Sequence, residues 1–207
     1  LRDRVAEACS FANRKEEDVQ ILPVTKNWPV SAIHYAQNAG FSRVGENRVQ
    51  EALGKFEDVS DMNWDLIGHL QSNKAKLVAG AFSRVQTVDS LKLLNKLNDA
   101  LKRAGKEIGI FIQVNTGYEE SKSGIKPEET KAFIEMCRSK GIKNILGLMC
   151  IPPLKEDPKI HFQLISKLSN ELSLGGASIG MSSDYLEALD FNPKYIRLGT
   201  VLFGKRT

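Results

Sequence analysis

The sequence has little of what marks secreted, membrane-bound or metal-binding proteins. It holds only three cysteines in 207 residues, Cys9, Cys137 and Cys150, at wide spacing. An odd, scattered set of thiols fits a reducing compartment better than a disulfide framework or a zinc site. The apolar runs are far shorter than the roughly 20 residues of a transmembrane helix, and no secretory pattern opens the chain. We therefore expect a cytoplasmic protein with no bound metal and no membrane association.

Aromatic residues and excess charge are also scarce. Aromatics make up 7% of the chain and the net charge is only +4. The basic residues are scattered among acidic ones, whereas a nucleic-acid-binding face gathers basic residues beside aromatics. We expect no nucleic-acid partner. The mild positive balance is compatible with a small anionic ligand.

No Pro/Gly/Ser-rich linker and no low-complexity segment divides the chain, so residues 1–207 are predicted to form a single domain. Short apolar or β-branched runs alternate with longer amphipathic segments. Several runs are apolar without alternation, as in strands covered on both faces. The eight predicted strands are residues 19–26, 42–46, 64–68, 84–89, 108–115, 145–151, 177–180 and 195–199.

The clearest predicted helix covers residues 90–106. Leu94, Leu97 and Leu101 recur there at helical spacing, and Gly105 is a stop signal. A second helix is expected to begin at Pro127, because proline and acidic residues suit a first helical turn.

A leading helix over residues 1–14 and eight strand–helix alternations predict an α/β protein built from parallel βαβ units with right-handed crossovers. Eight such units most economically close into a single (β/α)8 TIM-type barrel with an extra N-terminal helix. The rival is an open doubly wound sheet, but no GxGxxG turn follows the first strand.

In such a barrel the chemistry lies at the carboxyl ends of the strands. After the last two strands, the segments 180–184 and 197–204 place small and hydroxyl residues where a strand leads into a helix. Exposed N–H groups at such helix starts bind anions. Ser182, Ser183 and Asp184 could instead merely cap a helix. With a second small-residue segment in the adjacent loop, we prefer a phosphate site.

Lys26 ends the first predicted strand, in the stretch ILPVTKN. Many lysines at strand ends simply reach into water. An amine beside an anion site can also form a Schiff base with an aldehyde. Pyridoxal 5′-phosphate (PLP) and a phosphorylated sugar aldehyde both require an amine and a phosphate site, and spacing alone leaves all three interpretations open.

Seven motifs in order resemble those of the PLP homeostasis protein family (YggS/PROSC-like proteins), which are built like the N-terminal barrel of alanine racemase (PLP fold type III). The resemblance covers nearly the whole chain. The motifs are Val24–Lys26, Gly45–Glu51, Ile67–Lys74, Ser121–Ile125, Gly147–Met149, Met181–Tyr185 and Arg197–Gly204. One departure is the run 174–179 before the seventh strand, which leaves the start of that strand uncertain.

The resemblance implies PLP as cofactor and assigns a role to each matching residue. Lys26 would hold PLP as an internal aldimine, and Arg197 would face the pyridine nitrogen. The residues expected to hold the phosphate are Ser182 or Ser183 together with the backbone of Gly199 and Thr200.

Three further residues are expected near the cofactor: Asn47 and Met149 beside the ring, and Lys122 near the phenolic oxygen. His69 belongs to a motif, and a structural histidine is as good an interpretation as a ligand contact. His34 and His161 fall in helical segments and are expected to be surface or packing residues.

An always-cationic arginine only donates hydrogen bonds, so with Arg197 at the pyridine nitrogen the ring should be a weak electron sink. The resemblance also implies a contrast with racemases of this fold, which are longer proteins. Their additional C-terminal domain supplies a tyrosine as the second acid/base. This chain ends at Thr207, and no tyrosine lies in an equivalent segment; the four are Tyr35, Tyr118, Tyr185 and Tyr195.

We therefore expect a monomeric carrier or buffer of PLP that passes the cofactor to apo PLP-dependent enzymes, without strong catalysis of its own. One alternative is an amino-acid racemase or other PLP enzyme with Lys26 as its sole base. Another is a phosphosugar aldolase-like barrel, which the motifs around Arg197 and Met149 disfavour.

Overall fold

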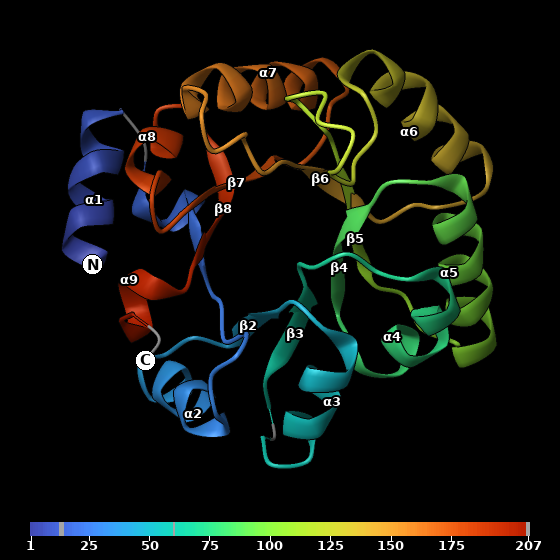
Figure 1. Cartoon of the computed structure of the whole chain (residues 1–207), viewed down its shortest axis with the longest axis horizontal. Coiled ribbons are helices and arrows are strands. Elements are labelled where there is room, and N and C mark those ends of the chain that lie inside the picture. Colours follow the sequence, from blue (N-terminus) through green and yellow to red (C-terminus); the bar gives the residue numbers. More distant parts are fainter. Residues whose placement is uncertain (13–14, 60, 206–207) are drawn as a thin grey trace.

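The computed structural model describes residues 1–12, 15–59 and 61–205. Eight parallel strands form one sheet in the order β1-β8-β7-β6-β5-β4-β3-β2, and the helices lie around its outer face (Figure 1). The strands are β1 (Gln20–Pro23), β2 (Arg43–Glu46), β3 (Asn63–Leu66), β4 (Arg84–Val88), β5 (Gly109–Gln113), β6 (Ile145–Met149), β7 (Ala177–Met181) and β8 (Pro193–Leu198). All eight predicted strands and the barrel itself are confirmed.

The α-helices are α1 (Arg2–Phe11), α2 (Val30–Asn38), α3 (Val49–Phe56), α4 (Ala75–Ala81), α5 (Leu91–Ala104), α6 (Thr130–Ser139), α7 (Pro158–Glu171), α8 (Tyr185–Leu189) and α9 (Thr200–Phe203). Three short 3-10 turns are η1 (Glu16–Asp18), η2 (Ser72–Lys74) and η3 (Pro127–Glu129). Among the described residues, no helix is both long and apolar enough to cross a bilayer.

The extra N-terminal helix is confirmed as α1, which ends at Phe11, while residues 13–14 of the predicted helix lie outside the described residues. Its buried side chains Val5 and Cys9 pack with Tyr185 and Leu189 of α8, and α1 lies beside α8 in Figure 1. This helix therefore covers the outer side of α8, the helix between β7 and β8.

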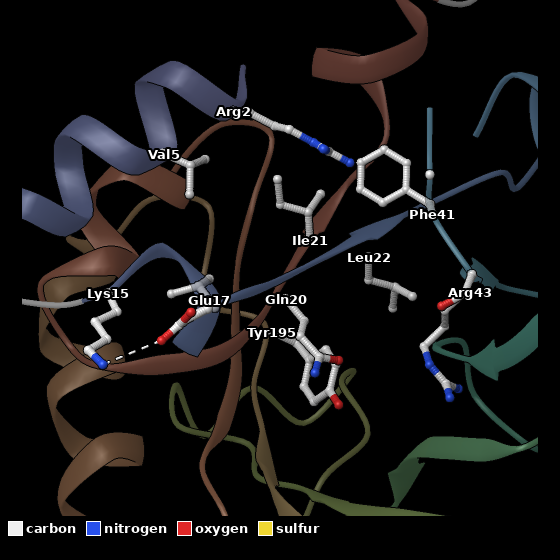
Figure 2. Close-up of a pocket in the computed structure, with 13 residues that line it drawn as sticks. Arg2, Val5, Lys15, Glu17, Gln20, Ile21, Leu22, Phe41, Arg43 and Tyr195 are labelled. Atoms are coloured by element: carbon white, nitrogen blue, oxygen red, sulfur yellow. Dashed lines mark ion pairs between the residues drawn. The ribbon is translucent and has the colours of Figure 1, made fainter. Parts of the chain in front are cut away.

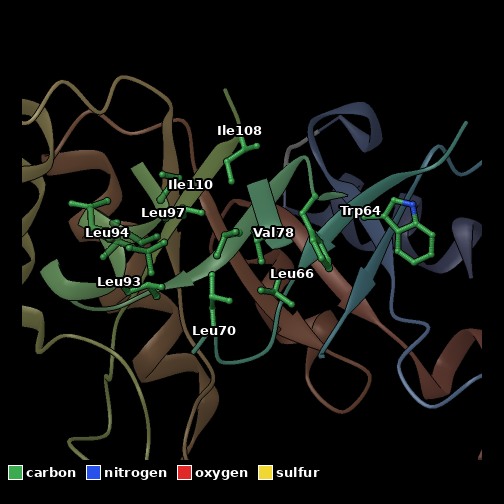
Figure 3. Packing of buried hydrophobic residues seen from close by; sticks show 14 of the residues in the cluster. Trp64, Leu66, Leu70, Val78, Leu93, Leu94, Leu97, Ile108 and Ile110 are labelled. Atoms are coloured by element: carbon green, nitrogen blue, oxygen red, sulfur yellow. The ribbon is translucent and has the colours of Figure 1, made fainter. Parts of the chain in front are cut away.

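Helix α5 follows its sequence signals closely. Ser90 caps its start by accepting a hydrogen bond from the Leu93 N–H at 3.4 Å, and Gly105 ends it in the left-handed conformation with φ of 62°. The leucines on one face are buried against the sheet, in the large cluster that Trp64 and Leu66 join from β3 (Figure 3). The helix expected from Pro127 begins as the turn η3 and continues as α6.

The barrel closes weakly between β1 and β2. β1 pairs with β8 along its whole length, but it meets β2 only at a single bridge between Val24 and Gly45. The Thr25 N–H donates to Gly45 O at 3.0 Å. Because backbone groups alternate along a strand, the nitrogen of Pro23 faces the same edge, and proline has no N–H to donate. The amino-terminal part of this edge, between Gln20–Pro23 and Arg43–Glu46, is called the seam below.

All three cysteines are buried thiols. Burial raises the pKa of the Cys137 thiol to about 11 and that of Cys150 to about 12. The thiolate is the reactive form, so the native protein should react with iodoacetamide at least about 100-fold more slowly than the denatured protein. Mass spectrometry of native and denatured samples at neutral pH measures this ratio, and fast labelling of the native thiols would contradict the burial.

Candidate functional site

A cavity of about 490 Å³ lies at the carboxyl ends of the strands. Seven of the nine predicted site residues line it: Lys26, Asn47, Ser182, Ser183, Arg197, Gly199 and Thr200. Sequence reasoning missed its apolar walls, which are Val24, Ile67, Ile151 and Met181. One amine, one guanidinium, two hydroxymethyl groups and the start of α9 therefore face a common space.

Lys26 is partly buried, in the turn that follows β1. Thr25, the residue before it, is fully buried, and its Oγ1 donates to Glu46 Oε1 at 2.6 Å. Asn27, the residue after it, has φ of 59°, a left-handed conformation that asparagine tolerates well, and its N–H donates to the carboxylate of Glu51. Both neighbours of Lys26 are thus fixed by carboxylates.

A buried lysine holds these carboxylates in place. Lys55 Nζ donates to Thr25 O at 3.0 Å, to Glu46 Oε1 at 2.8 Å and to Glu51 Oε1 at 2.9 Å. Burial raises the pKa of the Glu46 carboxyl, against the lowering effect of Lys55 and Thr25. Sequence reasoning did not single out Lys55. The available signal was the Glu51–Lys55 spacing of four residues, which pairs side chains on one helix face.

At the other side of the cavity, two backbone donors converge on one hydroxyl oxygen. The N–H groups of Gly199 and Val201 both donate to Ser182 Oγ at 3.3 Å. A phosphate oxygen accepts hydrogen bonds from the same kind of donors, so this loop fits the phosphate group that the sequence predicted.

Neither serine caps α8, the helix that directly follows them. α8 spans Tyr185–Leu189, and its N-cap residue Asp184 makes no side-chain cap hydrogen bond. The Asp184 carboxylate instead accepts from the Met181 N–H at 2.6 Å and from Ser183 Oγ at 3.2 Å. Ser182 Oγ accepts from the Gly199 and Val201 N–H groups at the start of α9, so it caps α9, and the capping alternative stays open beside the phosphate site.

Arg197 presents a buried guanidinium to the cavity wall. Its Nη1 donates to Ser178 O at 2.6 Å and to Ser178 Oγ at 2.7 Å, and its Nη2 donates to Cys150 O at 2.8 Å. Burial lowers its pKa from the ordinary arginine value, although arginine stays cationic in proteins. These bonds fix the plane of the guanidinium before any ligand is bound.

The hydrogen bonds of Arg197 continue through the barrel interior. Ser178 Oγ donates to Gln86 Oε1 at 2.6 Å, and Gln86 Nε2 donates to Asp65 Oδ2 at 2.8 Å. Asp65 Oδ1 in turn accepts from Arg43 Nη1 at 2.5 Å. An arginine side chain can only donate hydrogen bonds. The series of hydrogen bonds therefore runs from Arg197 at one end and from Arg43 at the other toward the carboxylate of Asp65, which accepts from both sides. Burial raises the pKa of Asp65, and Arg43 opposes that effect.

The structure does not bring Met149 or Lys122 to the cavity lining. Met149 is fully buried inside the barrel with Phe111 and Tyr195. Lys122 lies in the loop after β5, where its Nζ is 2.5 Å from Glu119 Oε2.

The three histidines also lie outside the lining. His34 is exposed on α2, and His161 is buried between Thr116 Oγ1 at 2.9 Å and Glu156 Oε2 at 3.2 Å, which confirms the surface and packing interpretations. His69 is exposed, with Nδ1 3.0 Å from Ser123 Oγ.

Gly68 packs directly against Asn47, which lines the cavity. A Cβ at position 68 would lie 2.0 Å from Asn47 O and 2.7 Å from Asn47 Cγ. Gly68→Ala should therefore force the backbones apart and lower the free energy of unfolding by about 1–3 kcal/mol in urea denaturation. The matched control is Gly54→Ala in α3, where nothing lies within 4 Å of the added carbon, so stability should rise by about 0.5–1 kcal/mol. Equal effects of the two changes would contradict the close approach.

The fold and cavity place the chain in a known class of barrel. The family model described as "Alanine racemase, N-terminal domain" matches residues 1–207. Alanine racemase from Clostridium difficile, at 17% identity, shares the fold with a TM-score of 0.77, over 99% of this chain and 57% of that chain.

Two curated relatives carry the description "Pyridoxal phosphate homeostasis protein". The one from Aquifex aeolicus is 36% identical over 99% of this chain and 94% of its own length. The one from Pseudomonas aeruginosa is 37% identical over 98% and 91%. The structure of PipY from Synechococcus elongatus with PLP bound has a TM-score of 0.82 at 33% identity, over 97% of this chain and all of that chain. This chain therefore belongs to the pyridoxal phosphate homeostasis protein family.

Proposed function

We propose that this protein binds PLP in the cavity at the carboxyl ends of the strands, holds it as a Schiff base on Lys26, and acts in PLP homeostasis as a carrier or buffer. One observation carries the proposal: the amine of Lys26, the guanidinium of Arg197 and the N–H donors that converge on Ser182 all belong to one cavity. The PLP-bound homologue adds support, since its barrel is similar over nearly this whole chain.

Each side of the cavity would hold a different part of the cofactor. Bound PLP supplies an aldehyde that condenses with amines and a ring that can accept electrons. Lys26 supplies the amine, and water leaves as the carbon–nitrogen double bond forms. Ser182 or Ser183 and the backbone of Gly199 and Thr200 hold the phosphate.

The remaining assigned residues would act around the ring. Asn47 lines the cavity and would contact the ring directly, and Arg197 would donate to the pyridine nitrogen. Lys122 would have to leave Glu119 to reach the phenolic oxygen, and Met149 would act through packing from the barrel interior.

Two arguments favour a carrier over a racemase. Arg197 is held as a donor by its bonds to Ser178 and Cys150, and a donor at the pyridine nitrogen keeps that atom unprotonated and the electron sink weak. Racemisation also needs a proton donor or acceptor on each face of the substrate. Lys26 and Arg197 are the titratable side chains among the lining residues, and arginine is a poor proton carrier.

None of the tyrosines supplies that second group to the cavity lining. Tyr35 and Tyr118 are exposed, at 71% and 57%. Tyr185 and Tyr195 are buried in apolar clusters and are not among the lining residues. In this role residues 1–207 form one PLP-binding domain, which works as a monomer and delivers the cofactor to apo-enzymes in a reducing, cytoplasmic compartment.

Borohydride trapping tests the proposal directly. Borohydride adds hydride to the carbon of the carbon–nitrogen double bond and leaves a stable secondary amine, so peptide mapping by mass spectrometry should find the pyridoxyl-phosphate adduct on Lys26. An unmodified Lys26 after incubation with PLP would overturn the proposed attachment.

A second measurement separates a carrier from an enzyme. The PLP-loaded protein is incubated with a panel of amino acids in deuterated water, and exchange of the α-proton is followed by NMR. We expect exchange no faster than with free PLP. Rapid exchange that Lys26→Ala abolishes would support the racemase alternative instead.

A further inference from the structure

A second cavity, larger than the first, opens at the amino-terminal end of the barrel. Its volume is about 710 Å³, within the range of sites that hold small organic molecules. It is lined from α1, from β1, from the segment that leads into β2, and from Tyr195 of β8 (Figure 2). It shares no lining residue with the Lys26 cavity.

The seam explains why this space exists. The cavity is lined on one side by residues Val19–Leu22 and on the other by Phe41–Arg43. No ladder of backbone hydrogen bonds joins these two segments, whereas such ladders join the other neighbouring strands. Since Thr25 donates toward β2, alternation of the backbone directs the Ile21 N–H to the same edge. The Ile21 N–H is thus a backbone donor in the cavity lining that makes no ladder hydrogen bond to β2.

The charged lining is cationic. Three cationic side chains, Arg2, Lys15 and Arg43, line the cavity with one carboxylate, Glu17, which is 3.5 Å from Lys15 Nζ. In Figure 2, Arg2 extends to the ring of Phe41, and its guanidinium carbon is 5.3 Å from the ring centroid.

Arg43 lies between this cavity and the barrel interior. Its Nη1 donates to Asp65 at 2.5 Å and to Ser83 Oγ at 3.0 Å. Both of its hydrogen bonds to described residues use the same nitrogen, and a guanidinium has five N–H donors. Arg43 therefore has donors to spare for a ligand in the cavity while Asp65 holds it in place.

The rest of the wall is apolar. Val5, Val19, Ile21 and Leu22 contribute aliphatic surface, and Phe41 contributes an aromatic face. A cationic rim around an apolar wall suits a molecule that has one anionic group and an apolar or aromatic body.

We propose that this cavity is a second ligand site, which takes a small organic anion with a phosphate or carboxylate group and an apolar body. The cationic side chains of the lining attract the anionic group, and the body packs against Phe41 and the aliphatic side chains. The two cavities share no lining residue and lie at opposite ends of the barrel, so ligand binding here is measured on the protein without PLP.

Phenyl phosphate is a suitable probe, with phenol as its neutral counterpart and inorganic phosphate as the anion alone. Each is titrated into the 15N-labelled protein in a phosphate-free buffer and followed by amide chemical shifts. We expect saturable shifts at residues 19–22 and 41–43 with phenyl phosphate, with a dissociation constant of about 1 mM or lower. Phenol and inorganic phosphate should each bind at least about tenfold more weakly.

Charge variants locate the anionic group. The double change Arg2→Gln with Lys15→Gln removes two exposed cations and should weaken phenyl phosphate binding at least about tenfold. Arg43 is left intact, because it neutralises buried Asp65. The matched control is Lys92→Gln with Lys96→Gln on α5, which makes the same charge change away from the cavity and should leave binding unchanged.

Three results would overturn the proposal: shifts at residues 19–22 and 41–43 that do not saturate, phenol binding as well as phenyl phosphate, or equal binding by the two double variants. Shifts confined to residues 199–201 would also overturn it, because they would place the anion at the Lys26 cavity alone. None of these results depends on whether PLP reacts with Lys26.

Discussion

Replacing Lys26 by alanine should abolish borohydride trapping of PLP and weaken PLP binding by about 100-fold or more, which corresponds to about 2.8 kcal/mol. The change removes the amine that forms the covalent bond and leaves only the phosphate and ring contacts. The Ser182 hydroxyl and the N–H donors of Gly199 and Val201 belong to other elements, so a weak, reversible complex should remain. Equilibrium dialysis gives the affinity, and loss of the Schiff-base absorbance reports the missing bond.

Two further variants separate covalent attachment from charge. Lys26→Arg keeps the positive charge but supplies no neutral amine, so it should also fail to trap PLP. Lys74→Ala removes a half-buried lysine that donates to Gln50 at 3.0 Å and does not line the cavity, and it should leave trapping intact. Retention of full affinity and a trapped adduct in Lys26→Ala would show that another amine carries the cofactor.

Lys55→Met should destabilise the fold by about 3–5 kcal/mol, the usual cost of removing one partner of a buried charged pair. The substitution leaves Thr25 O without its donor and sets Glu46 and Glu51 beside each other without the ammonium that joins them. Urea denaturation measures the loss. Since both residues that flank Lys26 depend on this network, the variant should also trap PLP more slowly.

The destabilisation should depend on pH in a defined direction. Burial already raises the pKa of Glu46, and removing Lys55 raises it further. A carboxyl group whose folded-state pKa is raised gives stability that is full below its unfolded pKa and is lost as pH rises through the folded pKa. The deficit of Lys55→Met should therefore be largest at neutral pH and should shrink as pH falls toward the ordinary range of a glutamic acid.

A double variant and a surface control test this explanation. Adding Glu46→Gln to Lys55→Met removes the charge that titrates, so it should flatten the pH dependence and recover part of the lost stability. Lys167→Met breaks an exposed pair with Glu171 at 3.9 Å and should leave urea unfolding unchanged. A Lys55→Met protein as stable as Lys167→Met would show that the buried network contributes little.

The strands were predictable because their signals are local. Buried parallel strands consist of short apolar runs, and β5, a clear case, is buried at every position. The ends of the strands were predictable for the same reason, which is why Lys26, Asn47 and Arg197 were found before the structure. The seventh strand begins at Ala177 as predicted, despite the unusual run before it.

The features that sequence reasoning missed depend on contacts between distant segments. The spacing of four residues on one helix predicts that Lys55 pairs with Glu51. It does not predict that Lys55 also lies beneath the turn that follows β1. Lys122 lies in a long loop, and it pairs with Glu119 rather than facing the cavity. Met149 ends a strand, as a site residue should, yet its side chain packs inside the barrel with Phe111.

Pro23 is the sequence feature that accompanies the seam, because proline has no N–H to donate to β2. Only the strand pairing in the structure shows that the edge between β1 and β2 is weakly joined. β1 is joined to β8 by a full ladder, and Val24 N donates to Leu198 O at 2.8 Å, whereas one bridge joins β1 to β2. If the barrel opens, it should open at the seam, with Lys26 and the loop of Gly199 on the same piece of sheet. Such opening would lie at the amino-terminal end of the barrel, because the Thr25–Gly45 hydrogen bond and Lys55 hold the carboxyl end of the same edge. The amino-terminal cavity would widen, while the distance between the Lys26 amine and the Gly199 loop would stay unchanged.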